Sequence, residues 1–242
     1  MRILDCQLVL SPSDLSNFLT CRHRAGLDLA AARGVIEKPR YEDPYAAMLR
    51  QHGDEHEHDY VDLLRAGGLV IVSAKPDSDT KAEESTRLTL EAMRSGAQVI
   101  VQARLEGDQI AGYADVLRRV EAPSTLGAWS YEVQDTKLAK ETKGGTILQL
   151  SAYSEMVGRI QGKVPEWFQV VTPGNPKGLP PRFNVEQYRV EDYAAYYRMV
   201  LATLRSNVAR GHEALLDTYY PDPVEACAVK IFSVGKCAAL AA

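Results

Sequence analysis

The sequence lacks several features that would place it in a specialised class of protein. Its 242 residues contain no apolar run near the roughly 20 residues that a membrane-spanning helix needs. The first residues, Met1 to Cys6, include an acid and lack the apolar core of a signal peptide. The four cysteines are not closely paired, which does not suggest a disulfide scaffold. We therefore expect a cytoplasmic globular protein with no membrane partner.

An excess of positive charge is also missing. The formal net charge is -4, so the surface is not the uniformly basic one of a protein that coats nucleic acid nonspecifically. Basic residues gather locally instead: Arg118 and Arg119 close one predicted strand, and Lys137, Lys140 and Lys143 follow another. Such a patch can follow a phosphate backbone, or it can be a solvated loop and strand end. Composition leaves both interpretations open.

The remaining composition, with 45% hydrophobic and 25% charged residues, is that of an ordinary globular protein long enough to bury a sizeable core. Periodicity and turn residues predict an α/β protein without internal repeats. Helices are predicted to begin near residue 12 and over 43–65, 79–94, 144–160 and 190–210, and strands over 69–73, 98–105, 109–120, 129–137, 167–171 and 183–189. We expect one domain over 1–242, with a helical N-terminal part (1–95), a core (96–190) and a C-terminal helix and cysteine tail (191–242).

Two aspartates, Asp115 and Asp135, interrupt otherwise apolar strands, and Lys137 follows the second by two residues. Because side chains alternate along a strand, Asp135 and Lys137 share one face, whereas Glu132 and Gln134 lie on the other. The aspartates are either ordinary strand-end acids or buried carboxylates that need a cation as partner. Carboxylates bind hard cations such as Mg²⁺, which polarise a phosphate and activate water, and an ammonium stabilises the developing charge. The pattern therefore predicts metal-assisted phosphodiester hydrolysis.

Histidines and acidic residues, which can bind metal ions, are also frequent in the segment 52–59. On a helix, residues two apart point in nearly opposite directions, so these residues do not form one site. The inward stripe is predicted to contain Leu49, Gly53, His56, Tyr60 and Leu63. On that stripe His56 is either a hydrogen-bonded core residue or a metal ligand, whereas His58 points away.

Gln149 and Tyr153 are four residues apart and share one face of a predicted helix. That helix can simply pack on the sheet through Leu148, Ala152 and Met156. A glutamine on the packed face nevertheless requires a polar partner, which the active site can provide.

In their order along the chain, Asp115, Asp135-x-Lys137 and Gln149-x-x-x-Tyr153 resemble the PD-(D/E)xK core of RecB-family nucleases. The stretch Gly53-Asp54-Glu55-His56 resembles the Gly-x-x-His motif on the helix before that core. The segment from Ser13 through Phe18 to Cys21 resembles the opening of the iron–sulfur branch, which includes CRISPR adaptation exonucleases and the nuclease domains of some helicase–nucleases. The resemblance extends from about residue 10 to residue 237.

The resemblance implies a restriction-endonuclease-like fold, in which a mixed sheet is flanked by helices and a helical lobe is formed by the two ends of the chain. It also implies a deoxyribonuclease dependent on Mg²⁺ or Mn²⁺ that acts on single-stranded DNA or DNA ends in repair, recombination or CRISPR-type processing. His56, Asp115 and Asp135 would hold the metal, Lys137 would be the base or an electrostatic group, and the glutamine–tyrosine pair would orient DNA or the lysine. The alternatives are a weakly active DNA-binding module of a larger helicase–nuclease and a structural domain of a CRISPR or repair complex.

The cysteines depart from the iron–sulfur branch, which holds a [4Fe–4S] cluster through one N-terminal and three C-terminal thiolates. Cys21 and Cys227 fit the first two ligand positions, and Cys237 comes just after the expected last one. Lys230 occupies the position of the third cysteine, and lysine is not a cluster ligand. A degraded cluster, a three-cysteine site and a corrupted C-terminus all fit this pattern. We expect little or no stable [4Fe–4S] cluster.

Overall fold

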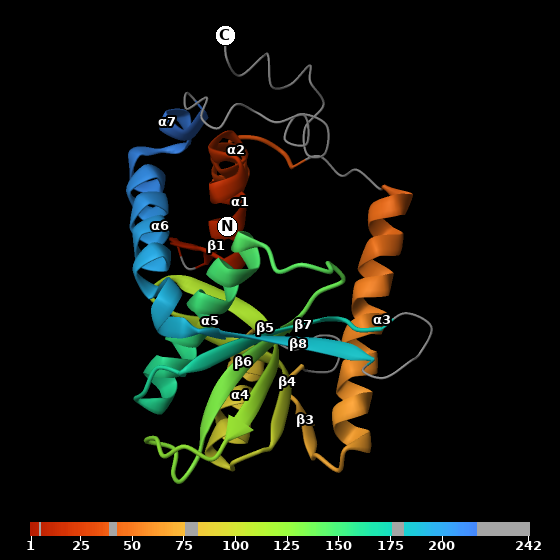
Figure 1. The fold of residues 1–242 in the computed structure, drawn as a ribbon. Coiled ribbons are helices and arrows are strands. Elements are labelled where there is room, and N and C mark those ends of the chain that lie inside the picture. The colour runs from red at the N-terminus through yellow and green to blue at the C-terminus, as the bar shows by residue number, and fades with distance from the viewer. Residues whose placement is uncertain (5, 39–42, 76–81, 176–181, 217–242) are drawn as a thin grey trace.

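The computed structural model describes residues 1–4, 6–38, 43–75, 82–175 and 182–216. Within these ranges, helices surround one large β-sheet, and a short hairpin of β1 (Arg2–Leu4) and β2 (Gln7–Val9) stands at the N-terminus (Figure 1). The helices are α1 (Pro12–Thr20), α2 (Arg22–Ala32), α3 (Pro44–Ala66), α4 (Ala82–Arg94), α5 (Gly144–Gln161), α6 (Val190–Arg210) and α7 (His212–Leu216). None of these described helices is both long enough and apolar enough to cross a membrane.

The large sheet has six strands in the order β3-β4-β5-β6-β7-β8. They are β3 (Ile71–Ser73), β4 (Val99–Gly107), β5 (Ile110–Val120), β6 (Ser130–Thr136), β7 (Trp167–Pro173) and β8 (Phe183–Arg189). Strand β3 runs parallel to β4, and β6 parallel to β7, whereas all other neighbours are antiparallel. The prediction of an α/β fold with a mixed sheet flanked by helices is confirmed. Its restriction-endonuclease-like topology stays a prediction.

Helices from the two ends of the chain pack beside one another above the sheet (Figure 1). Helix α1 begins as expected, because the Asp14 carboxylate accepts the backbone amide of the N-cap, Ser11, at 2.7 Å. Helices α2 and α7 approach so closely that a Cβ at Gly26 would lie 2.9 Å from the Cβ of Leu215. The second and the last described helices, α2 and α7, therefore pack directly against one another.

Two hydrophobic clusters cover the sheet. The main cluster joins α1, α4, α5 and α6 to the strands, and includes Leu15, Met93, Leu117, Val133, Leu148 and Leu204. The smaller cluster joins α3 to the sheet, and consists of Tyr60, Val61, Val99, Val116, Val171 and Phe183. Helix α3 and helix α5 therefore approach the strands from different sides.

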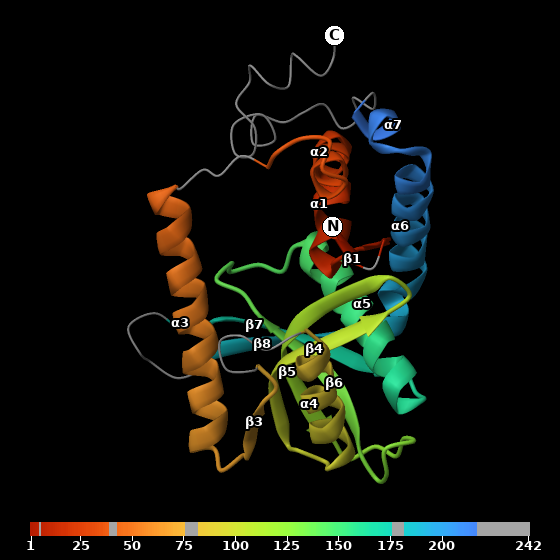
Figure 2. The same ribbon diagram turned by 180° about the vertical axis from the view of Figure 1, so that it is seen from behind.

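Strands β4 and β5 bend at Gln102 and Asp115. The pairing is interrupted at this point, and the same register holds on both sides of it, at Val101↔Val116 and Ala103↔Ala114. Val116 nevertheless packs in the smaller cluster and Ala114 in the main one, although a regular strand would direct both to the same face. Gln102 has a φ of 53°, in the left-handed region that non-glycine residues seldom occupy. The hairpin of β4 and β5 curls away from the rest of the sheet beyond this point (Figure 2).

Candidate active site

Asp115 and Asp135 lie opposite one another where the β5–β6 ladder ends. The last regular pair is Val116↔Gln134, and the same register places the two aspartates face to face at the next step. Beyond the last backbone pair, the side chain of Asp115 connects the two strands by hydrogen bonds. Its Oδ2 accepts the backbone amide of Thr136 at 2.9 Å and the hydroxyl of Thr136 at 3.1 Å. The sheet thus brings together the two carboxylates that the sequence analysis singled out.

Asp135 is a deeply buried acid with 1% of its surface exposed. Neither of its carboxylate oxygens accepts a well-directed hydrogen bond, although the Lys137 ammonium lies 2.5 Å from Oδ2 as an ion pair. Burial, and then the charge of Asp115, raise the pKa of Asp135 to about 7, against the opposing effect of Lys137. A buried carboxylate without donors is unfavourable, and a divalent cation would satisfy it.

Lys137 opens the loop that leads from β6 to α5. Its backbone amide donates to the carbonyl of Val171 at 2.9 Å, which fixes the residue beside β7. Burial favours the neutral amine, but the carboxylates of Asp135 and Asp115 outweigh it, so the pKa of Lys137 is raised. The side chain therefore carries a positive charge at neutral pH.

Tyr153 approaches the same site from α5. Its hydroxyl donates to the carbonyl of Tyr113 on β5 at 2.6 Å and is also hydrogen-bonded to the side chain of Gln149. Burial, followed by the charges of Asp135 and Asp115, raises the pKa of Tyr153. A Cβ at Gly112 would lie 2.7 Å from this hydroxyl, so glycine is required for the close approach of β5 and α5. The glutamine and tyrosine thus form one polar unit beside the carboxylates.

His56 lies on the inner side of α3 and contacts the neighbouring strands. Its Nε2 is 3.4 Å from the carbonyl of Val171, and its ring centroid is 5.1 Å from that of Phe183. The same carbonyl accepts the amide of Lys137, so His56 stands next to the lysine backbone. Its role as a metal ligand stays a prediction. His58 hydrogen-bonds the carbonyl of Asp54 on its own helix and is exposed, as expected.

Glu57 is the acid that the sequence analysis missed. Its Oε1 accepts a hydrogen bond at 2.5 Å from Gln102, the residue at the interruption of the β4–β5 pairing. Burial and then the charge of Asp115 raise the pKa of Glu57. The inward stripe of α3 consists of Gly53, His56, Glu57, Tyr60, Val61 and Leu64. The predicted stripe was wrong at Leu49 and Leu63, which are 43% and 46% exposed.

The opposite face of β6 carries polar side chains that are hydrogen-bonded to one another. The Tyr60 hydroxyl donates to Gln134 at 3.0 Å, Gln134 donates to Gln169 at 2.6 Å, and Gln169 donates to Glu132 at 2.9 Å. This series is called the amide ladder below. The prediction that Glu132 and Gln134 face away from Asp135 is confirmed, because the ladder contacts Tyr60 of α3.

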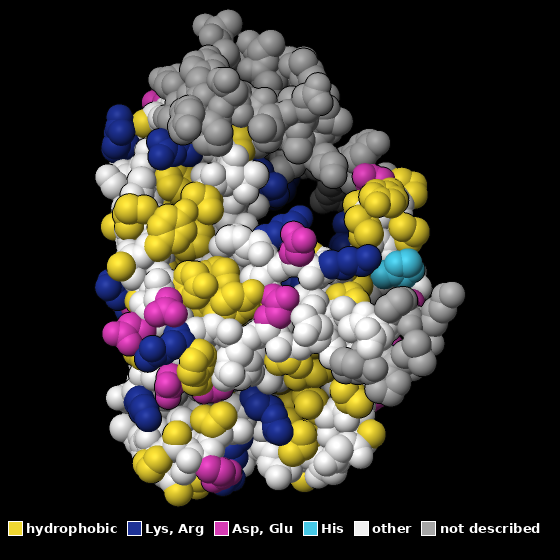
Figure 3. All heavy atoms as spheres, in the orientation of Figure 1, with side chains coloured by type: hydrophobic (Ala, Val, Ile, Leu, Met, Phe, Trp, Pro, Cys, Tyr) yellow, Lys and Arg dark blue, Asp and Glu magenta, His cyan; other side chains and the backbone are white. Residues whose placement is uncertain are grey.

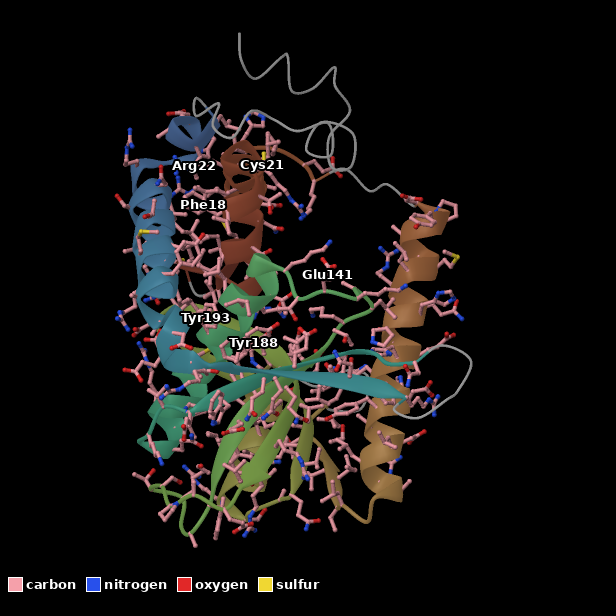
Figure 4. The ribbon with its side chains drawn as sticks, viewed as in Figure 1. Phe18, Cys21, Arg22, Glu141, Tyr188 and Tyr193 are labelled. Atoms are coloured by element: carbon pink, nitrogen blue, oxygen red, sulfur yellow. The ribbon has the colours of Figure 1, made fainter. Side chains whose placement is uncertain are left out.

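Cys21 is buried at the junction of α1 and α2, where its Sγ accepts the backbone amide of Arg24 at 3.4 Å (Figure 4). It is the N-cap of α2. The other proposed cluster ligands, Cys227 and Cys237, and the departure at Lys230 lie outside the described residues. The iron–sulfur prediction is therefore untested.

The described residues contain no set of three histidine, cysteine, aspartate or glutamate side chains that already surrounds a single metal position. The donor chemistry nevertheless fits a hard cation. Asp115 and Asp135 supply carboxylate oxygens, and those of Asp135 receive no directed hydrogen bond. Mg²⁺ and Mn²⁺ are the cations that such a donor set favours.

The surface is hollowed between α3 and the rest of the molecule, and both basic and acidic side chains lie at the edge of the hollow (Figure 3). The loop after Lys137 reaches toward α3 across this region, and Glu141 lies on it (Figures 1 and 4). Thr142 of the same loop donates to Glu186 of β8 at 2.5 Å, which ties the loop to the sheet. The basic residues Lys140 and Lys143 belong to this anchored loop.

No protein-family model matches the chain, and no curated protein matches it. The resemblance to RecB-family nucleases rests on the motifs in the sequence alone.

Proposed function

We propose that this protein is a metal-dependent deoxyribonuclease that hydrolyses phosphodiester bonds at the site formed by Asp115, Asp135 and Lys137. The observation that carries the proposal is Asp135. Its carboxylate is buried, receives no directed hydrogen bond, and stands opposite a second carboxylate and beside an ammonium. Two neighbouring carboxylates with one ammonium are unfavourable in a buried site, and a bound cation would stabilise them.

Each residue of the site has a separate task. A bound divalent cation would supply Lewis acidity and a water of lowered pKa. Asp115 and Asp135 would hold it, and the two hydrogen bonds from Thr136 fix the orientation of Asp115. Lys137, which is protonated beside Asp135, would stabilise the negative charge that develops on the phosphate. The raised pKa of the lysine favours this electrostatic role over that of a general base.

Tyr153 is proposed to position Asp115 and has no direct role in binding the cation or the phosphate. Its hydroxyl bridges Gln149 of α5 and the carbonyl of Tyr113, two residues before Asp115. The bridge holds β5 against α5 where Asp115 must be placed precisely enough for catalysis.

DNA is the proposed substrate because the loop that follows Lys137 carries the further basic residues Lys140 and Lys143. Such side chains bind the phosphate backbone without reading the base sequence. Following the resemblance, we propose single-stranded or end-containing DNA as the form that is cleaved, in repair, recombination or CRISPR-type processing.

A weakly active DNA-binding module is the second candidate. It is favoured by one observation, namely that no three ligand side chains of the described chain surround a metal position. On this hypothesis the protein would bind DNA but cleave it slowly, and a helicase partner would complete the activity.

The test is incubation of the purified chain with end-labelled single-stranded and double-stranded DNA in Mg²⁺, Mn²⁺ or EDTA. The proposal requires cleavage in at least one of the two metals and none in EDTA. Circular single-stranded DNA in parallel separates end-dependent from internal cleavage. DNA binding without cleavage in either metal would support the second candidate and contradict the first.

A further inference from the structure

We propose that Glu57 of α3 is a third carboxylate ligand of the cation held by Asp115 and Asp135. This inference rests on the proposed function, because it assumes that a divalent cation binds at the end of the β5–β6 ladder. It assigns a role to a residue that lies outside the motifs of the sequence analysis.

The position of Glu57 is fixed by the strained point of the sheet. Gln102 lies at the interruption of the β4–β5 pairing, between the pairs Val101↔Val116 and Ala103↔Ala114, and its side-chain amide donates to Glu57 Oε1 at 2.5 Å. The φ of 53° at Gln102 is a conformation that costs energy in a residue other than glycine. Strain of this kind persists where the surroundings require it, and here it accompanies the contact that ties α3 to the strand carrying Asp115.

One oxygen of Glu57 remains free for a ligand. Gln102 is hydrogen-bonded to Oε1 only, and Glu57 forms no ion pair with a lysine or arginine among the described residues. The carboxylate is near enough to Asp115 and Lys137 to interact electrostatically with both. Gln102 therefore orients the group while leaving half of it available.

The charges of the site are also unbalanced without a cation. Three carboxylates, Glu57, Asp115 and Asp135, interact electrostatically with one ammonium, that of Lys137, in a partly or fully buried region. When all are ionised, two negative charges remain, which one divalent cation neutralises. The unbonded oxygens of Asp135 independently indicate that a positive group belongs there.

The proposal also has a conformational consequence. Because the carboxylates do not yet surround one point, cation binding would draw α3 toward β5.

The test is calorimetric titration of Mn²⁺ into the metal-free full-length protein and its variants. Glu57→Gln keeps the shape and the bond from Gln102 but removes the charge, and should weaken Mn²⁺ binding about tenfold or more. Glu55→Gln is the matched control, because Glu55 lies on the same helix but is exposed and bonded only to Gln51. It should bind Mn²⁺ like the wild type. The rise in melting temperature caused by Mn²⁺ should shrink in Glu57→Gln and not in Glu55→Gln.

Asp135→Asn separates failure of this inference from failure of the proposed function. If Asp135→Asn loses Mn²⁺ binding but Glu57→Gln retains wild-type affinity, Glu57 is not a ligand and the proposed site stands. If the wild type binds no Mn²⁺, or Asp135→Asn binds it unchanged, both proposals are overturned. Circular dichroism of each variant in EDTA confirms that it is folded.

Discussion

Two buried acids on β6, Glu132 and Asp135, differ in how the protein accommodates their charge. Glu132 is 7% exposed and ends the amide ladder, where Gln169 donates to it at 2.9 Å. Asp135 is 1% exposed and has only the ion pair with Lys137. Burial is the largest cause of a raised pKa in both residues. Glu132 therefore has a hydrogen-bond donor within the fold, whereas Asp135 has the Lys137 ammonium and no directed hydrogen bond.

Burial by itself therefore does not identify a functional acid. What distinguishes the two residues is the supply of hydrogen-bond donors, because donors reduce the cost of burying a carboxylate and their absence leaves that cost in full.

Removal of the charged groups beside Asp135 should nearly abolish cleavage. Asp115→Ala and Lys137→Ala should each reduce the rate of DNA hydrolysis on the order of 10²–10³-fold or more. The double variant should lose little beyond either single one, because the two groups act as a unit. Glu132→Gln, which preserves the amide ladder in shape, should stay within a few-fold of the wild type in the same assay. A loss in Glu132→Gln as large as that in Lys137→Ala would show that the active site lies on the face of β6 that carries Glu132, not on the face of Asp135.

Stability should respond in the opposite order. In EDTA at pH 8, Asp135→Asn should raise the free energy of unfolding by about 1–3 kcal/mol, because burial and the charge of Asp115 disfavour the ionised carboxylate even with Lys137 beside it. Glu132→Ala should lower it by about 1–3 kcal/mol, because Gln169 loses its acceptor. Urea denaturation of the two variants measures both effects. A destabilised Asp135→Asn protein would show that Asp135 contributes to the fold.

The metal-free protein should lose stability as the pH rises. The folded-state pKa of Asp135, about 7, lies above the unfolded value, so the folded state binds this proton more tightly. The stabilising contribution is fully present below about pH 4 and is lost as the pH rises through about 7. Melting temperatures in EDTA should therefore fall across this interval, and saturating Mn²⁺ should oppose the fall. An Asp135→Asn variant with the same pH profile would assign the effect to another group.

The secondary structure could be predicted from the sequence more completely than the site. Helix α3 was expected over 43–65 and spans Pro44–Ala66, and all six strands of the large sheet were expected close to their observed bounds. Proline, glycine and apolar alternation are local signals, so they locate elements without knowledge of the fold. The break between α1 and α2 at Cys21 and the short N-terminal hairpin were not predicted, since neither carries a strong local signal.

Glu57 could not be found in this way, because its role depends on which way a helix faces. The stripe drawn through Leu49 and Leu63 assumed that the whole of α3 packs on the core. In the structure the buried residues Tyr60 and Val61 lie in the second half of the helix. The helix face that they define differs from the predicted one, and Glu57 lies on it. The bend at Gln102, whose side chain donates to Glu57, depends on tertiary structure, and no proline or glycine at this position indicates it in the sequence. By contrast, Asp115 and Asp135 could be paired in advance because strand alternation limits their faces.

Replacement of His56 should have a smaller effect, mainly on the choice of metal. Imidazole suits softer cations better than an all-oxygen donor set does, so His56→Ala should lower activity several-fold and shift the preference between Mg²⁺ and Mn²⁺. His58→Ala, on the exposed side of α3, is the matched control and should be silent. Cleavage rates in the two metals provide the comparison. An unchanged metal preference and rate in His56→Ala would return this histidine to a packing role against Phe183.

The smallest effect is expected from the hydroxyl of Tyr153. Tyr153→Phe keeps the ring but removes the bond of 2.6 Å to the carbonyl of Tyr113, which should cost about 1 kcal/mol, or roughly fivefold in rate. Gln149→Ala should give a similar loss, because the same polar unit is broken. If each single variant lowers the rate but the double variant loses no more than either, the two side chains act together.

The most direct measurement is the rate of DNA cleavage in Mn²⁺ by the wild type, Asp135→Asn and Glu132→Gln under identical conditions. The charge is removed from one buried acid in each variant, and circular dichroism confirms that both are folded. If the unsatisfied carboxylate holds the catalytic cation, Asp135→Asn is inactive, Glu132→Gln cleaves at nearly the wild-type rate, and EDTA abolishes cleavage by both active proteins. Cleavage by Asp135→Asn at the wild-type rate, or cleavage that persists in EDTA, would contradict that claim.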